Sequence, residues 1–176
     1  MNILELKEKY AKAHEVYLKY KDINGTNNVE YSYLQEVVEI LKSIDPTSTV
    51  IINNDNFLNY LGCDIIWATN NSVKTIDVKI CQHCSENEIL CDGWKHNNNE
   101  FFKATDVKIN DYFLFRNCSK WILVPFSEIV RNIPKTEECF YLRRDLKRTT
   151  LKFILNINKI RKRVIDSDFT RLTKSN

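Results

Sequence analysis

Two acidic residues and a lysine lie close together in the stretch GCDIIWATNNSVKTIDVKICQ, which runs from Gly62 to Gln82. Asp77 and Lys79 are two residues apart in a segment that alternates apolar and polar side chains, so a strand places both on one face. Asp64 belongs to the segment before it, across a short polar turn. We therefore expect two carboxylates and one ammonium to converge on a single patch.

Such a patch is suited to binding a metal ion and hydrolysing a phosphodiester bond. Magnesium prefers oxygen ligands, and Asp64, Asp77 and the backbone carbonyl of Val78 can supply three of them. A bound metal ion polarises the phosphate and lowers the pKa of a coordinated water. Lys79 is suited to orient or deprotonate that water and to stabilise the negative charge that develops. The alternative is an ordinary solvent-facing hairpin edge, where charged side chains discourage edge-to-edge pairing.

The elements that position these residues are expected to be helices first, then a strand-rich centre, then a helix. Apolar residues at three- and four-residue steps predict helices over 3–21 and about 29–43. Strands are predicted at 48–53, 63–69, 73–80, 89–94, 112–117 and 120–126, with hairpins at 63–80 and 112–126. The partly periodic spacing of Leu151, Ile154, Leu155 and Ile160 predicts that 146–164 is mostly helical. This order indicates an α/β or α+β layer fold with a mixed central sheet, and we expect an α/β fold with helices flanking that sheet.

The segment from Gly62 to Ile80 resembles the PD-(D/E)XK nuclease superfamily. In that superfamily an Asp opens the second core strand and an acidic-x-Lys triplet lies in the third, where this chain has Asp64 and Asp77-Val78-Lys79. Cys63 stands where the family pattern has a proline, which is commonly absent. The resemblance covers residues 30–82, and it implies a restriction-endonuclease-like core that cleaves DNA with Mg²⁺ or Mn²⁺.

The resemblance implies two further polar residues in the site. Family members usually have a Glu on the helix before the hairpin, and Glu30 lies in line with the apolar stripe of the expected helix, whereas Glu36 and Glu39 fall on its other side. Glu30 is therefore the preferred third acid and metal ligand, with Glu36 next, although Asn27 and Glu30 also have capping-box spacing. Gln82 matches an extra polar residue that some members place shortly after the triplet.

A cluster of cysteines after the second hairpin strand offers a different kind of metal site. Cys81, Cys84, Cys91 and His96 are four potential ligands of a tetrahedral structural zinc, and His83 is a fifth. The first two cysteines have Cys-x2-Cys spacing, but the spacing of the second pair does not fit a common zinc finger. A cysteine in an apolar strand also behaves as a small hydrophobic residue. Structural zinc therefore stays an alternative to a buried thiol cluster.

Basic residues are concentrated towards the C-terminus. Residues 141–176 contain 11 Lys or Arg and 3 Asp or Glu, whereas residues 1–140 contain 15 and 20. This distribution, taken with the family resemblance, predicts a nuclease-like core over 1–140 and a basic, mainly helical C-terminal extension over 141–176. A polyanion such as DNA is the expected partner of the extension, and the alternative is a solvated helix face. The expected DNA contacts are Arg143, Arg144, Lys147, Arg148, Arg161, Lys162 and Arg163.

Composition limits the compartment and the other partners. No stretch approaches the roughly 18 apolar residues of a membrane span, and the N-terminal segment has no apolar core of signal-peptide type. We therefore expect a cytoplasmic protein without membrane contact, in which the six cysteines are mostly reduced. Because small nucleases that cut both strands usually act as two-fold dimers, a homodimer is also expected.

The sequence thus predicts a metal-dependent DNA endonuclease of the restriction, homing, resolvase or defence type. Two other functions compete with it. The same fold without catalysis would make a DNA-binding protein, and a zinc-bound cysteine cluster would make an interaction domain.

Overall fold

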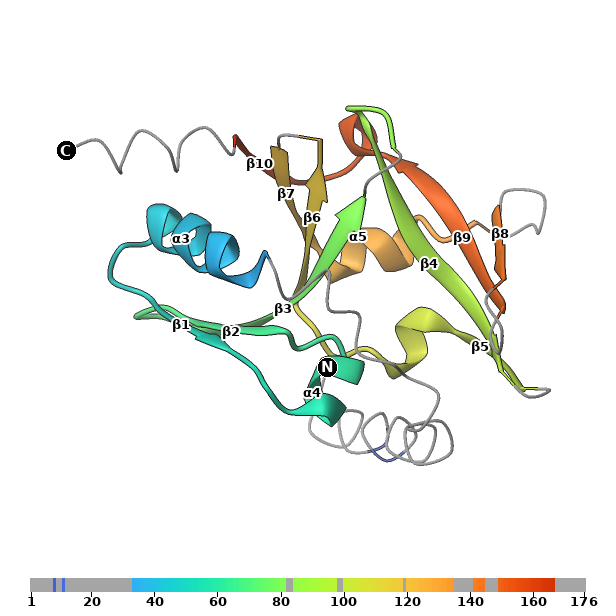
Figure 1. The fold of residues 1–176 in the computed structure, drawn as a ribbon, viewed down its shortest axis with the longest axis horizontal. Helices are drawn as coiled ribbons and strands as arrows, with labels where there is room; N and C mark the ends of the chain where they lie inside the picture. The colour runs from blue at the N-terminus through green and yellow to red at the C-terminus, as the bar shows by residue number, and fades with distance from the viewer. Residues whose placement is uncertain are drawn as a thin grey trace.

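The computed structural model describes residues 8, 11, 33–81, 84–97, 100–118, 120–134, 141–144 and 149–166, and it is a mixed α/β structure (Figure 1). Its helices are α3 (Leu34–Ile44), α4 (Asn56–Tyr60), α5 (Phe126–Arg131) and the 3-10 turns η1 (Ala104–Val107) and η3 (Ile157–Lys159). Its strands are β1 (Thr49–Ile52), β2 (Ile65–Ala68), β3 (Val73–Cys81), β4 (Glu88–Asn97), β5 (Glu100–Lys103), β6 (Tyr112–Asn117), β7 (Lys120–Pro125), β8 (Tyr141–Arg144), β9 (Thr149–Asn156) and β10 (Arg163–Asp166). The predicted hairpins β2–β3 and β6–β7 are confirmed.

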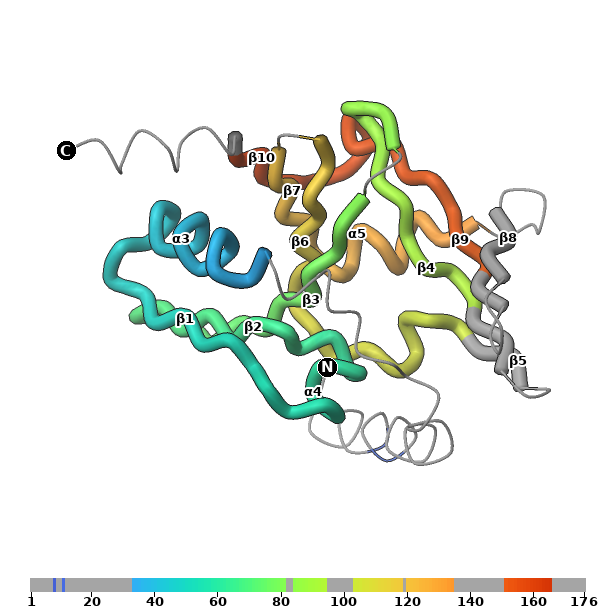
Figure 2. The backbone as a smooth tube through the Cα atoms, viewed as in Figure 1, coloured from blue at the N-terminus to red at the C-terminus, as the bar shows by residue number. Residues whose placement is uncertain are grey.

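The central sheet has the strand order β1-β2-β3-β6-β7-β10. Neighbouring strands in this sheet are antiparallel, except that β3 and β6 run parallel. In that pair Asp77 stands opposite Phe113 and Lys79 opposite Phe115. Parallel neighbours need a long crossover connection. Here the crossover contains β4, β5 and η1, so the chain leaves the middle of the sheet, builds half of a second sheet and returns (Figure 2).

The second sheet has the order β5-β4-β9-β8 and is antiparallel. The predicted helix over 146–164 is wrong, because β9 and β10 occupy most of that range. Phe153, Leu155 and Ile157 are buried at every second residue, which is the period of a strand. The expectation of a mainly helical C-terminal extension fails with it, since β9 pairs with β4 and β10 pairs with β7.

The two faces of the central sheet are covered by different partners. Helix α3 lies along one face, where Val37 and Ile40 pack on a cluster that includes Ile76 and Val78 of β3. The second sheet and α5 cover the other face, as Figure 1 shows. Because side chains alternate along β3, the residues between those apolar ones point to the second-sheet side. Asp77 therefore lies inside the protein, between the two sheets.

The predicted N-terminal helix over 3–21 lies outside the described residues apart from residues 8 and 11, which are helical. The helix predicted over about 29–43 is confirmed over its described part, where Leu34, Val37 and Leu41 are buried. Its first residues, including Glu30, lie outside the described residues.

Candidate active site

The loop before β2 is held in place by hydrogen bonds. Asp55 caps α4 by accepting the Leu58 N–H at 2.8 Å, and the Asn53 side chain donates to the Cys63 carbonyl at 2.7 Å. Gly62 follows α4 with φ +86°, a backbone conformation that favours glycine. The sequence therefore makes a tight, hydrogen-bonded turn that delivers the chain to β2.

The missing side chain of Gly62 allows three other side chains to approach the loop. A Cβ at this position would lie 2.8 Å from Asn110 Oδ1 and 2.9 Å from both Asp77 Oδ2 and Lys108 Cδ. These distances are shorter than ordinary van der Waals contact. The bare Cα of Gly62 is therefore a requirement of the site.

Asp64 is held beside β3 by its own backbone and side chain. Its N–H donates to the Ile76 carbonyl at 3.0 Å, and its Oδ2 accepts the Val78 N–H at 2.7 Å. The pairing of β2 with β3 ends at Ile65 and Ile76, so Asp64 stands just beyond that ladder. The two carboxylates are close enough for the negative charge of Asp77 to act on Asp64.

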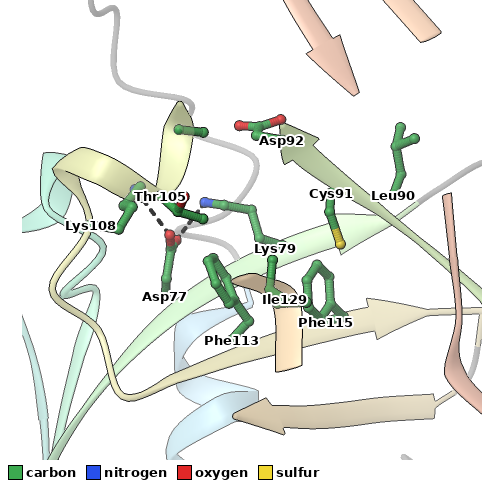
Figure 3. A pocket seen from close by; sticks show the side chains of 11 residues that line it. Asp77, Lys79, Leu90, Cys91, Asp92, Thr105, Lys108, Phe113, Phe115 and Ile129 are labelled. Atoms are coloured by element: carbon green, nitrogen blue, oxygen red, sulfur yellow. Dashed lines mark hydrogen bonds and ion pairs between the residues drawn. The ribbon is translucent and has the colours of Figure 1, made fainter. Parts of the chain in front are cut away.

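Asp77 and Lys79 lie on the same face of β3 and form an ion pair, as predicted. The Lys79 Nζ donates to Asp77 Oδ1 at 2.5 Å and to the Val78 carbonyl at 3.2 Å (Figure 3). The Asp77 side chain is only 1% exposed, whereas that of Lys79 is 27% exposed. The ammonium thus contacts two of the three oxygens that were expected to bind a metal ion.

A second lysine, which the sequence analysis did not single out, completes the group. Lys108 follows η1, and its Nζ lies 3.0 Å from Asp77 Oδ2 in an ion pair that lacks the alignment of a hydrogen bond. Figure 3 shows Asp77 between the two ammonium groups. The sequence contains one pattern that relates Lys108 to Lys79: the tetrapeptide Asp-Val-Lys-Ile occurs at 77–80 and again at 106–109. The two copies have different backbones but bring both lysines to one carboxylate.

The two carboxylates have opposite pKa shifts. Burial, followed by the negative charge of Asp77, raises the pKa of Asp64 to about 7. Burial by itself would raise the pKa of Asp77 too, but Lys108 and Lys79 outweigh it and lower that pKa to about 2. Asp64 is only partly buried. Its pKa is nevertheless raised, because the charge of Asp77 and the burial both raise it. Asp77 is therefore ionised at neutral pH, whereas Asp64 keeps its proton to a higher pH than an exposed carboxyl does.

A cavity of about 20 Å³ lies beside the Asp77–Lys79 pair. Roughly 10–15 Å³ is enough to hold one water, so the space suits a water molecule and is too small for a nucleobase. Its polar lining consists of Asp77, Lys79, Asp92, Thr105 and Lys108, most of which Figure 3 shows around the ion pair, and its apolar lining consists of Leu90, Cys91, Ala104, Phe113, Phe115 and Ile129. Asp64 does not line this cavity.

Glu36 lies away from this group. Its Oε1 accepts the Trp121 indole N–H at 2.8 Å, and its Oε2 lies 3.8 Å from Arg116 Nε. The expectation that Glu36 points away from the sheet is therefore wrong, but it contacts the α3 face, opposite Asp77. Glu30 and Gln82, the other expected polar residues, lie outside the described residues.

The predicted zinc ligands are only partly brought together. Cys81 and Cys91 are buried between the sheets and Cys84 packs against them. Burial raises the pKa of the Cys81 thiol to about 12 and that of Cys91 well above its usual range. The backbone of His96 lies five residues beyond Cys91 on β4, roughly 16 Å away at the rise of a strand. Within the described residues, no three His, Cys, Asp or Glu side chains are grouped to hold a metal ion.

The basic residues of the C-terminal region have mixed surroundings. Arg161 Nε donates to Glu128 Oε1 at 2.8 Å, and Lys162 Nζ donates to the Ile157 carbonyl at 2.5 Å. Arg163 is exposed on the edge strand β10. Of the remaining expected DNA contacts, Arg143 and Arg144 lie on β8, and Lys147 and Arg148 lie outside the described residues.

No protein-family model, curated protein or solved structure matches this chain. In the part of the chain that the structure describes, no helix is both long and apolar enough to cross a membrane. Inferences about function therefore depend on the side chains gathered around Asp77.

Proposed function

We propose that the chain is a metal-dependent DNA endonuclease of the PD-(D/E)XK type, which hydrolyses phosphodiester bonds. The observation that carries the proposal is the grouping of three side chains at β3: Asp64 accepts the N–H of Val78, and Asp77 and Lys79 on either side of Val78 form an ion pair. A restriction-endonuclease-like core is supported by the β2–β3 hairpin in a mixed sheet. The restriction, homing, resolvase and defence roles all remain within this proposal.

The residues present fit a hard divalent cation. Asp64, Asp77 and the Val78 carbonyl offer oxygen atoms, which Mg²⁺ and Mn²⁺ prefer. The ammonium of Lys79 already contacts Asp77 Oδ1 and the Val78 carbonyl, so a cationic group occupies the position in the structure. Asp64 uses Oδ2 for the Val78 N–H and has Oδ1 to offer a cation. When bound, the metal ion would polarise the phosphate and acidify a water.

The protein's own groups have complementary roles in hydrolysis. Lys79 and Lys108 keep Asp77 ionised, which prepares it as an anionic ligand at neutral pH. Lys79 is also positioned to orient a water held in the adjacent cavity and to donate to the charge that develops on the phosphate. The ammonium groups of Lys79 and Lys108 would attract the phosphate of the substrate. The basic residues of the C-terminal region would add contacts to the DNA backbone.

The proposal is tested by incubating the protein with supercoiled and linear DNA in Mg²⁺, in Mn²⁺ and in EDTA. Cleavage is expected with either metal ion and is expected to be lost in Asp64→Asn and Lys79→Met. Glu86→Gln and Lys42→Met are matched controls, because both remove exposed charges away from the site. Cleavage that persists in the site variants, or no cleavage of duplex, branched or single-stranded DNA, would overturn the proposal.

A specific observation favours a second candidate, a DNA-binding protein of the same fold that does not cleave. Both oxygens of Asp77 are covered by ammonium groups, Lys79 on Oδ1 and Lys108 on Oδ2. A site that never exchanges these for a metal ion would bind phosphate without cutting it. DNA binding by the wild-type protein without cleavage in any metal ion would support this candidate. Light scattering with and without DNA tests the proposed homodimer.

A further inference from the structure

Lys108 is the least exposed ammonium of the site. Its side chain is 11% exposed, against 27% for Lys79, and its Nζ lies 3.0 Å from the buried Asp77 Oδ2. Its backbone N–H donates to the Thr105 carbonyl at 3.3 Å, at the end of η1. The protein therefore places a buried positive charge on the oxygen that Lys79 does not contact.

Asn110 faces the same group with an unsatisfied acceptor. The residue is 3% exposed, and among the described residues its Oδ1 has no hydrogen-bond partner. Its Nδ2 donates to the Tyr112 carbonyl at 2.8 Å, which fixes the amide orientation because the reverse would set two oxygens against each other. A buried acceptor is costly to leave without a donor, which a water, an ion or another side-chain conformation can supply.

The side chain of Lys108 and these two acceptors come together at Gly62. Its Cδ lies 2.9 Å from the position of a Gly62 Cβ, which is also 2.9 Å from Asp77 Oδ2 and 2.8 Å from Asn110 Oδ1. The backbone around it is fixed, since the Ile109 N–H donates to the Leu61 carbonyl at 2.9 Å. Asn110 Oδ1 is therefore an acceptor close to the Lys108 side chain that has no donor among the described residues.

We propose that Lys108 is a displaceable counter-ion of the metal site, and that Asn110 receives it. Without a divalent cation, Lys108 neutralises Asp77. When a cation binds between Asp64 and Asp77, the ammonium turns to Asn110 Oδ1 and leaves Asp77 to the cation. Lys108 is then a positioning residue that competes with the cation for Asp77 and so sets the affinity for the cation. This inference rests on the proposed function, because the cation is that of the nuclease site.

Direct ligation by Asn110 is the competing explanation. A cation shared by Asn110 Oδ1 and Asp77 Oδ2 would have to occupy the space that Lys108 Cδ and Gly62 now fill. The counter-ion exchange needs no such vacancy. The two explanations predict different couplings between Lys108 and Asn110.

The test is a titration of the full chain with Mn²⁺, in which free Mn²⁺ is followed by electron paramagnetic resonance without DNA. Lys108→Met is expected to tighten Mn²⁺ binding roughly tenfold, because it removes a competing positive charge. Lys108→Arg is expected to weaken binding, because a guanidinium grips a carboxylate through two hydrogen bonds. Lys42→Met, an exposed lysine on α3, is the matched control and should leave the affinity unchanged.

Asn110→Leu completes a double-mutant cycle. It is expected to weaken Mn²⁺ binding several-fold when Lys108 is present and to have no effect in the Lys108→Met background. Weakening in both backgrounds would indicate direct ligation and overturn the proposal. Unchanged or weaker binding by Lys108→Met would overturn it as well. Circular dichroism establishes which variants are folded.

If Lys108→Met does not fold, the charge-conserving variant decides, and Lys108→Arg that binds Mn²⁺ as tightly as wild type overturns the proposal. Failure of the nuclease proposal gives a different result. A protein that binds no Mn²⁺ in any variant and cuts no DNA removes both proposals together. If the wild-type protein binds Mn²⁺ and cleaves DNA but the Lys108 and Asn110 variants do not change the Mn²⁺ affinity as expected, only the counter-ion proposal is overturned.

Discussion

Asp64 completes the hydrogen bonding of β3 with its side chain, since its Oδ2 accepts the Val78 N–H at 2.7 Å. Strand β2 begins at Ile65 and pairs with β3 only as far as Ile76. The Val78 N–H lies beyond that ladder, and a carboxylate takes the place of the missing strand. One residue therefore stabilises the sheet and supplies an oxygen to the proposed metal site.

The raised pKa of Asp64 predicts that stability falls as the pH rises. The folded protein binds this proton more tightly than an unfolded chain, whose carboxyl has a pKa near 3.8, so the free energy of unfolding should decrease between about pH 4 and pH 7. Asp64→Asn retains an acceptor for the Val78 N–H and should remove that decrease. Urea unfolding from pH 4 to pH 8 measures it. A variant with the wild-type slope would contradict the prediction, and Glu86→Gln is the control that should keep the slope.

The lowered pKa of Asp77 predicts the opposite behaviour at acidic pH. Its contribution to stability is complete above about pH 4 and is lost as the pH falls towards 2. Asp77→Asn should abolish that acid sensitivity and should destabilise the protein at pH 7 by roughly 3–5 kcal/mol, because two ammonium groups lose their carboxylate. Urea unfolding at pH 7 and acid titration followed by circular dichroism test both statements. A neutral effect at pH 7 would show that the lysines find other partners.

Gly62→Ala should disrupt the site through the backbone and through contact. A non-glycine residue at φ +86° carries a strain of about 1–3 kcal/mol, and the added Cβ would press on Asp77 and Asn110. We expect a loss of about 2 kcal/mol or more in urea unfolding. Asn71→Ala, an exposed turn position, should change stability by less than about 0.5 kcal/mol. Equal stability of the two variants would mean that the loop before β2 can move aside.

DNA binding should distinguish two adjacent basic residues. Arg163 is exposed, whereas the Lys162 ammonium donates to the Ile157 carbonyl. Arg163→Ala should lower the affinity for duplex DNA and reduce the slope of log affinity against log salt by about 1. Lys162→Ala should have a smaller effect on both. Fluorescence anisotropy at several salt concentrations measures them, and equal effects would mean that Lys162 leaves its carbonyl to contact phosphate.

Thiol labelling should follow burial. Cys118 is exposed, whereas Cys81 and Cys91 are buried and burial raises the pKa of both thiols. A maleimide should therefore modify Cys118 rapidly and the two buried thiols only on unfolding, because the thiolate is the reactive form. Peptide mapping by mass spectrometry identifies each site. Early labelling of Cys91 in the folded protein would indicate that the two sheets separate readily.

The local part of the site is predictable from sequence, and the distant part is not. Alternation along β3 places Asp77 and Lys79 together, because strand geometry acts over two residues. Lys108 lies 31 residues after Asp77 in an irregular segment. The parallel pairing of β3 with β6 returns the chain to the side of Asp77. A repeated tetrapeptide indicates a likeness between the two lysines, but no spacing rule predicts that they meet.

The C-terminal strands illustrate a different kind of error. Leu151, Ile154 and Leu155 have helical spacing, but Phe153 does not fit that pattern. The buried residues are Phe153, Leu155 and Ile157, and the decisive partner is β4, whose Cys91 stands opposite Phe153. Strand preference depends on the neighbouring strand more than on the local sequence. The expectation that Glu36 points away from the sheet fails for a similar reason, because Trp121 and Arg116 of the sheet contact its carboxylate.

The parallel pairing of β3 with β6 also determines when the site comes into existence during folding. The β2–β3 hairpin has a short turn and can form early, and it carries Asp64, Asp77 and Lys79. Lys108 arrives only after the whole crossover through β4 and β5 has closed, and closing a long loop is slow. Until then the Asp77 carboxylate lacks one of its two counter-ions and the cover of the second sheet. We therefore expect the complete site to form late in folding. An incompletely folded chain would present Asp64, Asp77 and Lys79 without Lys108.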